Sequence, residues 1–212
     1  KMQKQILVNV EPRETRVGVI EGLVLQDYFV ERPGHKGIVS NIYKGRVDAI
    51  VPGLAAAFVD IGLEKDGFLY AGEVATETMD NLPLEFDESA LEEARHRHTG
   101  EIDKLLKKNQ DILIQVEKDA VGTKGPRLTQ YISIPGRFLV LMPLQKRHIG
   151  ISKKIEGDDR VRLKKILAEL RISNDVGLIV RTAANRASAR ELERELKFLQ
   201  KIWGRVKNLA NR

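Results

Sequence analysis

Short stretches in which apolar and polar residues alternate recur along the first 134 residues, and residues 44–74 contain the clearest examples. Alternation with a period of two predicts β-strands, and turn residues separate three of them within this segment. The strand at residues 55–61 is predicted to have two distinct faces: Ala57, Val59 and Ile61 form one, and Ala56, Phe58 and Asp60 form the other.

The next predicted strand places Phe68 and Tyr70 together on one face, with Leu69 opposite them. Aromatic rings on the outer wall of a small barrel can serve as a platform for single-stranded RNA, because any base can stack on a ring. The alternative is that Phe58 and Phe68 fill the interior of the barrel or pack against a neighbouring part of the protein.

Residues 37–134 are predicted to form a five-stranded barrel, which an acidic segment near residues 76–110 interrupts between the third and fourth strands. Short helices are predicted within that segment, at residues 89–98 and 101–108. Residues 5–32 are predicted to form further strands joined by turns. The barrel strands are expected near residues 38–51, 54–62, 67–72, 111–118 and 127–134.

Helical periodicity replaces this alternation near the end of the chain. A helix is predicted at residues 160–170, with Asp158 or Asp159 as its N-cap. The final helix is predicted to begin at a capping box formed by Ser188 and Glu191. Its apolar stripe requires a partner surface and consists of Leu192, Leu196, Leu199, Trp203, Val206, Leu209 and Ala210.

Composition is that of an ordinary globular protein of one or two domains, with 212 residues, 42% hydrophobic and 31% charged. The sequence contains neither a run of roughly 18 apolar residues nor a secretion signal, so a cytoplasmic protein is expected. Cysteine is absent, which excludes disulfides, thiolate zinc sites and cysteine nucleophiles within these residues.

Charge is divided unevenly between the two parts of the chain. Residues 1–123 carry 15 Lys and Arg against 22 Asp and Glu, whereas residues 124–212 carry 21 against 8. The net charges are therefore −7 and +13. A strongly basic second part is typical of a protein that binds a polyanion, although a solvated basic helix face produces the same count.

Catalytic groups are not evident in the sequence. One acidic cluster, Glu156 with Asp158 and Asp159, lies next to basic residues, and it could either bind a metal ion or cap a helix. The second interpretation is favoured, and no glycine-rich phosphate loop or Ser-His-Asp order stands out. We therefore predict no catalytic residue and no metal ligand.

A phosphate site is better supported. Arg181 and Thr182 follow a predicted apolar strand at residues 176–181, so a guanidinium and a hydroxyl would emerge together at a sheet edge. Arginine holds a terminal phosphate through two parallel hydrogen bonds, and threonine adds a third donor. The main-chain N–H of Gly136 and the cation of Lys153 would complete the site if the fold brings them close. The alternative is an arginine that is merely solvated.

Seven motifs that follow one another along almost the whole chain resemble those of the ribonuclease E/G family of bacterial endoribonucleases. They are residues 43–47 (YKGRV), 56–62 (AAFVDIG), 66–69 (DGFL), 123–125 (TKG), 139–143 (LVLMP), 151–160 (ISKKIEGDDR) and 177–183 (GLIVRTA).

The resemblance implies an α+β fold in which a five-stranded OB-fold barrel and a mixed α/β sensor domain are both inserted in a partial RNase H-like subdomain. Residues 1–36 and the helix at residues 188–212 would belong to the RNase H-like subdomain. Residues 37–134 would form the RNA-binding barrel, and residues 135–187 would form the sensor for 5′-phosphates.

The same resemblance implies site residues. Phe58, Phe68 and Lys124 would contact RNA at the barrel, where the alternation adds Tyr70. The 5′-phosphate would be held by Gly136, Val140, Arg181 and Thr182, the first two through their main chain. Where the family pattern has an arginine in the sensor, this sequence has Lys153, which is a point charge rather than a planar fork.

The function implied by the resemblance is the binding of single-stranded RNA, preferably 5′-monophosphorylated, in the processing and decay of mRNA and rRNA. Magnesium, a linking zinc and homo-oligomerisation are implied for the full-length family member through segments beyond residue 212, so this chain alone is expected not to cut RNA. Two rival interpretations remain. One is a free-standing OB-fold protein of translation or ribosome assembly, and the other is a module that docks protein.

Overall fold

The computed structural model confirms a mixed α+β architecture with a closed five-stranded barrel and few helices. The chain forms two compact units, Lys1–Ile38 and Val39–Arg212, and each is described by itself. The structure describes residues 4–32, 37–75, 101–145, 148–173 and 175–211.

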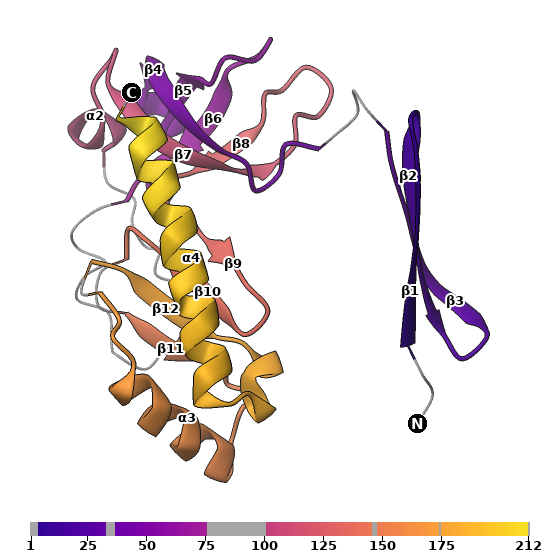
Figure 1. The fold of residues 1–212 in the computed structure, drawn as a ribbon. Coiled ribbons are helices and arrows are strands. Elements are labelled where there is room, and N and C mark those ends of the chain that lie inside the picture. Colours follow the sequence, from indigo (N-terminus) through magenta and orange to yellow (C-terminus); the bar gives the residue numbers. More distant parts are fainter. Residues whose placement is uncertain (1–3, 33–36, 76–100, 146–147, 174, 212) are drawn as a thin grey trace. The chain divides into compact units, whose positions relative to one another are not determined.

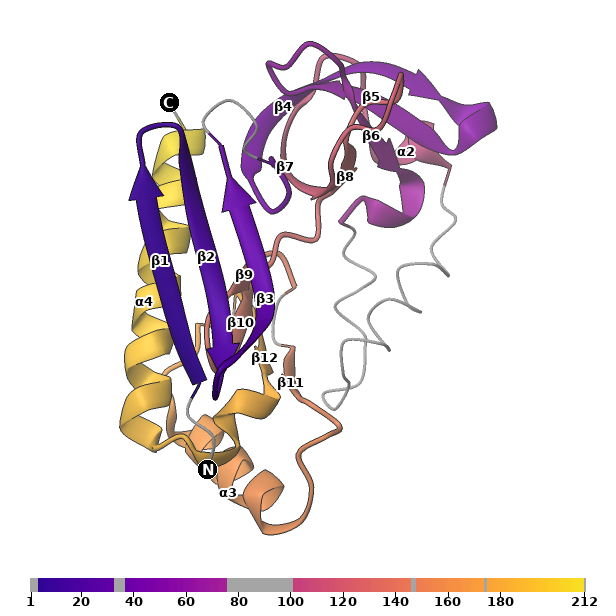
Figure 2. The same ribbon diagram turned by 90° about the vertical axis from the view of Figure 1, so that its right-hand side faces the viewer.

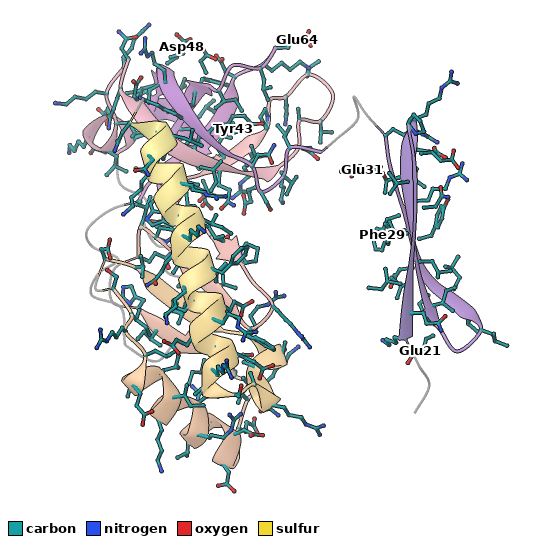
Figure 3. The ribbon with its side chains drawn as sticks, viewed as in Figure 1. Glu21, Phe29, Glu31, Tyr43, Asp48 and Glu64 are labelled. Carbon is teal, nitrogen blue, oxygen red and sulfur yellow. The ribbon has the colours of Figure 1, made fainter. Side chains whose placement is uncertain are left out.

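The first unit is a three-stranded antiparallel sheet in which β2 pairs with both of its neighbours. Figure 2 shows the three strands side by side, and Figure 3 shows side chains such as Phe29 projecting from the sheet. Every residue of the two outer strands is exposed within this unit. The strands expected at residues 5–32 are therefore present as β1 (Lys4–Glu11), β2 (Glu14–Glu21) and β3 (Val24–Glu31).

The second unit begins with the barrel, whose strands close in the order β4-β5-β6-β8-β7 (Figure 1). Its interior is filled by side chains with no exposed area: Val47, Ala57, Val59, Leu69, Ile114 and Leu128. The strands are β4 (Ile42–Val51), β5 (Ala56–Asp60), β6 (Gly67–Tyr70), β7 (Asp111–Lys118) and β8 (Arg127–Thr129), so a barrel of five strands is confirmed. The fifth strand is shorter than the predicted residues 127–134, because Ile134 belongs to a strand of the next sheet.

Three short helices accompany the barrel: η1 (Pro52–Leu54), η2 (Ala71–Glu73) and α2 (Ile102–Leu105). Helix α2 occupies part of the segment predicted to be helical at residues 101–108. The helix predicted at residues 89–98 lies outside the described residues.

A four-stranded sheet with the order β11-β12-β10-β9 follows the barrel. Strand β12 runs parallel to β11 and antiparallel to β10, and all four of its residues are buried. This sheet shares one apolar core with helices α3 (Gly157–Glu169) and α4 (Ala189–Ala210). Its strands are β9 (Ile134–Pro135), β10 (Leu139–Met142), β11 (Ile149–Ile151) and β12 (Gly177–Val180).

Helix α3 begins earlier than the sequence predicted, so neither Asp158 nor Asp159 is its N-cap. The N-cap is Glu156, whose side chain makes no capping hydrogen bond. Gly157 has φ +57°, a conformation that glycine adopts without strain, and the chain enters the helix there. The two aspartates lie in the first turn, where the helix dipole favours negative charge.

Helix α4 begins at the predicted capping box. The Ser188 hydroxyl accepts a hydrogen bond from the Glu191 amide, and the Glu191 carboxylate accepts one from the Ser188 amide at 2.8 Å. The hydrogen bond from the Ser188 main chain is the main reason that the pKa of Glu191 is lowered. The predicted apolar stripe is buried at Leu192, Leu196, Leu199 and Trp203, half-buried at Val206 and exposed at Leu209.

Replacing the cap should destabilise the second unit. Ser188→Ala removes the acceptor for the Glu191 amide, so the free energy of unfolding should fall by about 0.5–2 kcal/mol. Trp203 is the single tryptophan of the chain and is buried on α4, so its fluorescence during urea unfolding reports this loss. Ser188→Asp keeps an acceptor and serves as the control. Equal midpoints for all three proteins would contradict the role of the cap.

Candidate nucleic-acid interface

Three aromatic rings form a cluster on the outer face of the barrel. Phe58 and Phe68 lie opposite each other on β5 and β6, with ring centroids 5.3 Å apart and planes at 78°. Tyr70 follows along the same face, 4.5 Å from the Phe68 ring. Both phenylalanines are partly exposed and Tyr70 is 43% exposed, whereas Leu69 between them is fully buried. The rings therefore do not fill the barrel.

Ala56 departs from the predicted alternation. It was expected on the outer face with Phe58, but it is fully buried. Val51 and Tyr70 pair with Ala56 from the two neighbouring strands, and its short side chain does not reach beyond them.

Arg127, which no sequence motif singled out, joins this cluster from β8. Its guanidinium carbon lies 5.2 Å from the centre of the Tyr70 ring, within the range of a cation–π contact. Two carboxylates hold the guanidinium, Glu117 at 2.7 Å and the buried Glu73 at 3.4 Å. Arg127 therefore fixes the position of Tyr70, and its charge is balanced locally.

Lys124 lies on an exposed turn that leads directly into this cluster. The turn closes through main-chain hydrogen bonds between Val121 and Lys124, at 3.0 and 3.2 Å. A second cation, Lys65, donates to the carbonyl of Gly122 at 2.6 Å. Two residues after Lys124, the carbonyl of Pro126 accepts a hydrogen bond from the Phe68 amide. Lys124 therefore precedes the strand β8, whose Arg127 pairs with Phe68.

Acidic groups also lie on the barrel strands. Burial raises the pKa of Asp66, and the nearby carboxylates of Asp48 and Asp60 raise it further. Asp48 is labelled on β4 in Figure 3. Negative charge at these positions disfavours phosphate.

The predicted phosphate residues gather at one edge of the four-stranded sheet. Because β11 and β12 are parallel, Lys153 and Arg181 both follow the carboxyl ends of neighbouring strands, and Thr182 comes next. Strand β10 is antiparallel and starts at this same edge, where Leu139 pairs with Val180. Val140 lies one residue further into the sheet, opposite Ile179.

Arg181 is held in a defined orientation. Its Nη1 atom donates to the carbonyl oxygen of Gly136 at 2.7 Å, and its main-chain amide donates to the carbonyl of Phe138 at 2.8 Å. The amide of Gly136, predicted as a phosphate donor, donates here to the carbonyl of Leu139 at 2.7 Å. Gly136 therefore orients the arginine through its carbonyl group.

Two arginines of helix α3 hold the segments that carry the other residues of this edge. Arg160 donates to the carbonyls of Ile151, Ser152 and Ile155 at 3.2 to 3.3 Å, and these flank Lys153. Arg162 donates to the carbonyls of Asn185 and Ala187 at 2.7 and 2.8 Å, just after Thr182. Sequence reasoning missed both residues, because their partners are main-chain atoms.

Potential metal ligands are not grouped among the residues that the structure describes. Across the described residues, no three or more His, Asp or Glu side chains lie where they could share a metal ion. The magnesium and zinc implied by the resemblance therefore have no candidate ligand set among those residues.

Within the same residues, no helix has the length and apolarity needed to cross a membrane.

Comparisons with known proteins relate this chain to one family of ribonucleases. The sequence model of the ribonuclease E/G family matches residues 133–212. Ribonuclease G of Escherichia coli (strain K12) is 43% identical over 206 residues, which cover 97% of this chain and 40% of that protein. Ribonuclease G of Haemophilus influenzae is 41% identical over 202 residues, covering 95% of this chain and 39% of that protein.

Similarity extends to a longer relative. Ribonuclease E of Escherichia coli (strain K12) is 41% identical over 208 residues, which cover 98% of this chain and 19% of that protein. The chain thus spans 40% or less of the length of these curated relatives.

The turn that carries Lys124 should be intolerant of added volume at Gly125. A Cβ atom at Gly125 would lie 1.8 Å from the carbonyl oxygen of Asp66, which is main chain and cannot move aside. Gly125→Ala should therefore destabilise the barrel by about 1–3 kcal/mol, as measured by hydrogen exchange of the β6 and β8 amides. Gly53→Ala is the control, because nothing lies within 4 Å of its new Cβ. Unchanged exchange in Gly125→Ala would contradict the close approach.

Proposed function

Since the chain belongs to the ribonuclease E/G family, we propose that it binds single-stranded RNA and recognises 5′-monophosphate ends in the processing and decay of RNA. In this proposal residues 37–134 are the RNA-binding barrel and residues 135–187 are the sensor. Residues 1–36 and 188–212 belong to an RNase H-like subdomain. The convergence of Arg181, Thr182 and Lys153 at one sheet edge is the observation that carries the proposal.

At the barrel, the bases of the RNA stack on the rings of Phe58, Phe68 and Tyr70. The edge-to-face arrangement of the rings leaves each of them partly exposed, so bases can reach them. Stacking gives affinity with little dependence on sequence, because every base has a π-face. Lys124 adds a cation next to the rings for the phosphate backbone.

At the sheet edge, the terminal phosphate is bound by the guanidinium of Arg181, the Thr182 hydroxyl and the Lys153 ammonium group, with Val140 contributing main chain. The hydrogen bond from Arg181 to Gly136 occupies one nitrogen and leaves the rest of the fork for a ligand. A monophosphate presents its oxygens directly to this fork, whereas a triphosphate is bulkier and fits less well. A 5′-hydroxyl offers no anion at all.

Truncating a ring should weaken binding to any single-stranded RNA. Phe58→Ala removes one stacking surface worth about 1–3 kcal/mol, so affinity for a short 5′-hydroxyl RNA should fall by about 5- to 150-fold. Fluorescence anisotropy with a labelled oligonucleotide measures this loss. Leu54→Ala is the control, because Leu54 is a large side chain of the barrel segment that is 57% exposed.

Salt dependence provides a second readout of the same complex. Affinity for RNA should decrease with salt with a log–log slope of about −0.7 for each phosphate contact. If Phe58→Ala binds RNA as tightly as the unaltered chain and salt has little effect, the RNA platform is excluded and a protein-docking role is favoured.

Removing the guanidinium should abolish recognition of the 5′ end. The unaltered chain should bind a 5′-monophosphorylated RNA more tightly than its 5′-hydroxyl form, and Arg181→Ala should bring the ratio of the two affinities to about one. Arg186→Ala is the control, because Arg186 is exposed at the end of the same segment, η4 (Thr182–Arg186). Equal affinity of the unaltered chain for both RNAs would disprove end recognition without affecting RNA binding.

A further inference from the structure

Three consecutive main-chain amides surround one carboxylate close to the edge of the four-stranded sheet where Arg181 and Thr182 lie. The carboxylate of Glu195 on α4 accepts a hydrogen bond from Phe138 at 2.8 Å, from Leu139 at 3.1 Å, and from Arg137 at short range. Successive amides that point to one spot form a concave site for an anion, and here a side chain of the same protein fills it. The helix thus holds the loop between β9 and β10.

Gly136 makes room for this carboxylate. A Cβ atom at Gly136 would lie 2.4 Å from Oε1 and 2.8 Å from Cδ of Glu195. Gly136 is not one of the glycines with positive φ. Glycine is therefore needed at this position because a side chain would not fit, and not because of the backbone conformation. The Glu195 carboxylate therefore fits only because residue 136, which lies 59 positions earlier in the chain, has no side chain.

The loop held by Glu195 is the same loop that orients Arg181. The carbonyl of Gly136 accepts from Arg181 Nη1, and the carbonyl of Phe138 accepts from the Arg181 amide. Any movement of this loop therefore moves both acceptors of the arginine.

We infer that Glu195 is a positioning residue for the phosphate clamp, which acts by fixing the 136–139 loop and, through it, the direction of the Arg181 guanidinium. This inference rests on the proposed function of Arg181. It gives helix α4 a role in end recognition that its apolar stripe alone does not suggest.

The sign of the expected effect distinguishes positioning from simple electrostatics. A carboxylate near a phosphate repels it, so if repulsion dominated, neutralising Glu195 would raise the affinity for a 5′-phosphate. The three amide hydrogen bonds instead balance the charge of Glu195 within the protein. Neutralisation then releases the loop, and the affinity for a 5′-phosphate falls.

The test compares two isosteric variants of one helix. Glu195→Gln should lower the preference for 5′-monophosphorylated over 5′-hydroxyl RNA by about ten-fold, which corresponds to the loss of one charge-assisted hydrogen bond. Glu193→Gln removes the same charge from α4, but Glu193 pairs with Lys197 on the helix surface, and the preference should not change. The affinity for 5′-hydroxyl RNA should be the same in all three proteins, because that RNA binds at the barrel.

Two further variants separate geometry from charge. Glu195→Asp keeps the charge but withdraws the oxygens from the amides, and Gly136→Ala pushes the carboxylate out of the loop. Both should lower the preference as Glu195→Gln does. In the Arg181→Ala background, Glu195→Gln should have no further effect on the preference. The unfolding midpoint measured by Trp203 fluorescence should be nearly the same for these variants and the unaltered chain. The difference should not exceed that expected for the loss of one hydrogen bond.

Different negative results would contradict different parts of the proposal. If the unaltered chain prefers 5′-monophosphorylated RNA and Arg181→Ala removes the preference, but Glu195→Gln leaves it unchanged or raises it, the positioning role is wrong and the clamp stands. If the unaltered chain shows no preference, the proposed function itself fails before Glu195 is tested. An additive effect of Glu195→Gln in the Arg181→Ala background would also overturn the inference.

Discussion

The geometry of the strand ends that carry Arg181, Thr182 and Lys153 depends on how Val180 is paired. Val180 is fully buried, and it pairs with Leu139 of one neighbouring strand and with Ile151 of the other. Its carbonyl also accepts a hydrogen bond from the Ser152 amide at 2.9 Å. Since both partners fix this residue, Arg181 leaves the sheet at one place and in one direction. The proposed phosphate site depends in part on this exit point.

The barrel depends on the alternation of side chains along its strands. Residues such as Val59 and Leu69 fill the interior, and the residues between them carry aromatic rings to the outside. The rings support one another through edge-to-face contacts, so they need little cover from the rest of the chain. A rigid platform of this kind loses little conformational entropy when a flexible polynucleotide binds.

The basic part of the chain uses some of its positive charge internally. Arg160 and Arg162 donate to main-chain carbonyls, and Arg127 is balanced by two carboxylates. Conversely, Glu195 accepts from main-chain amides. Charged side chains on helices therefore hold the loops next to the strand ends that carry Arg181, Thr182 and Lys153. The net charge of a segment overstates how many of its cations can contact a ligand.

The sequence by itself determined most of the elements and, apart from Ala56, the faces of the strand that carries Phe58. Period-two alternation placed the five barrel strands and the outward rings, and the Ser188 capping box fixed the start of α4, because both patterns depend on residues a few positions apart. It misplaced the start of α3, where the conformation of Gly157 decides. Only the tertiary structure brought Gly136 to Arg181 and Glu195 to the 137–139 amides, because these contacts join main-chain groups to side chains 45 to 58 positions away, and no local periodicity records them.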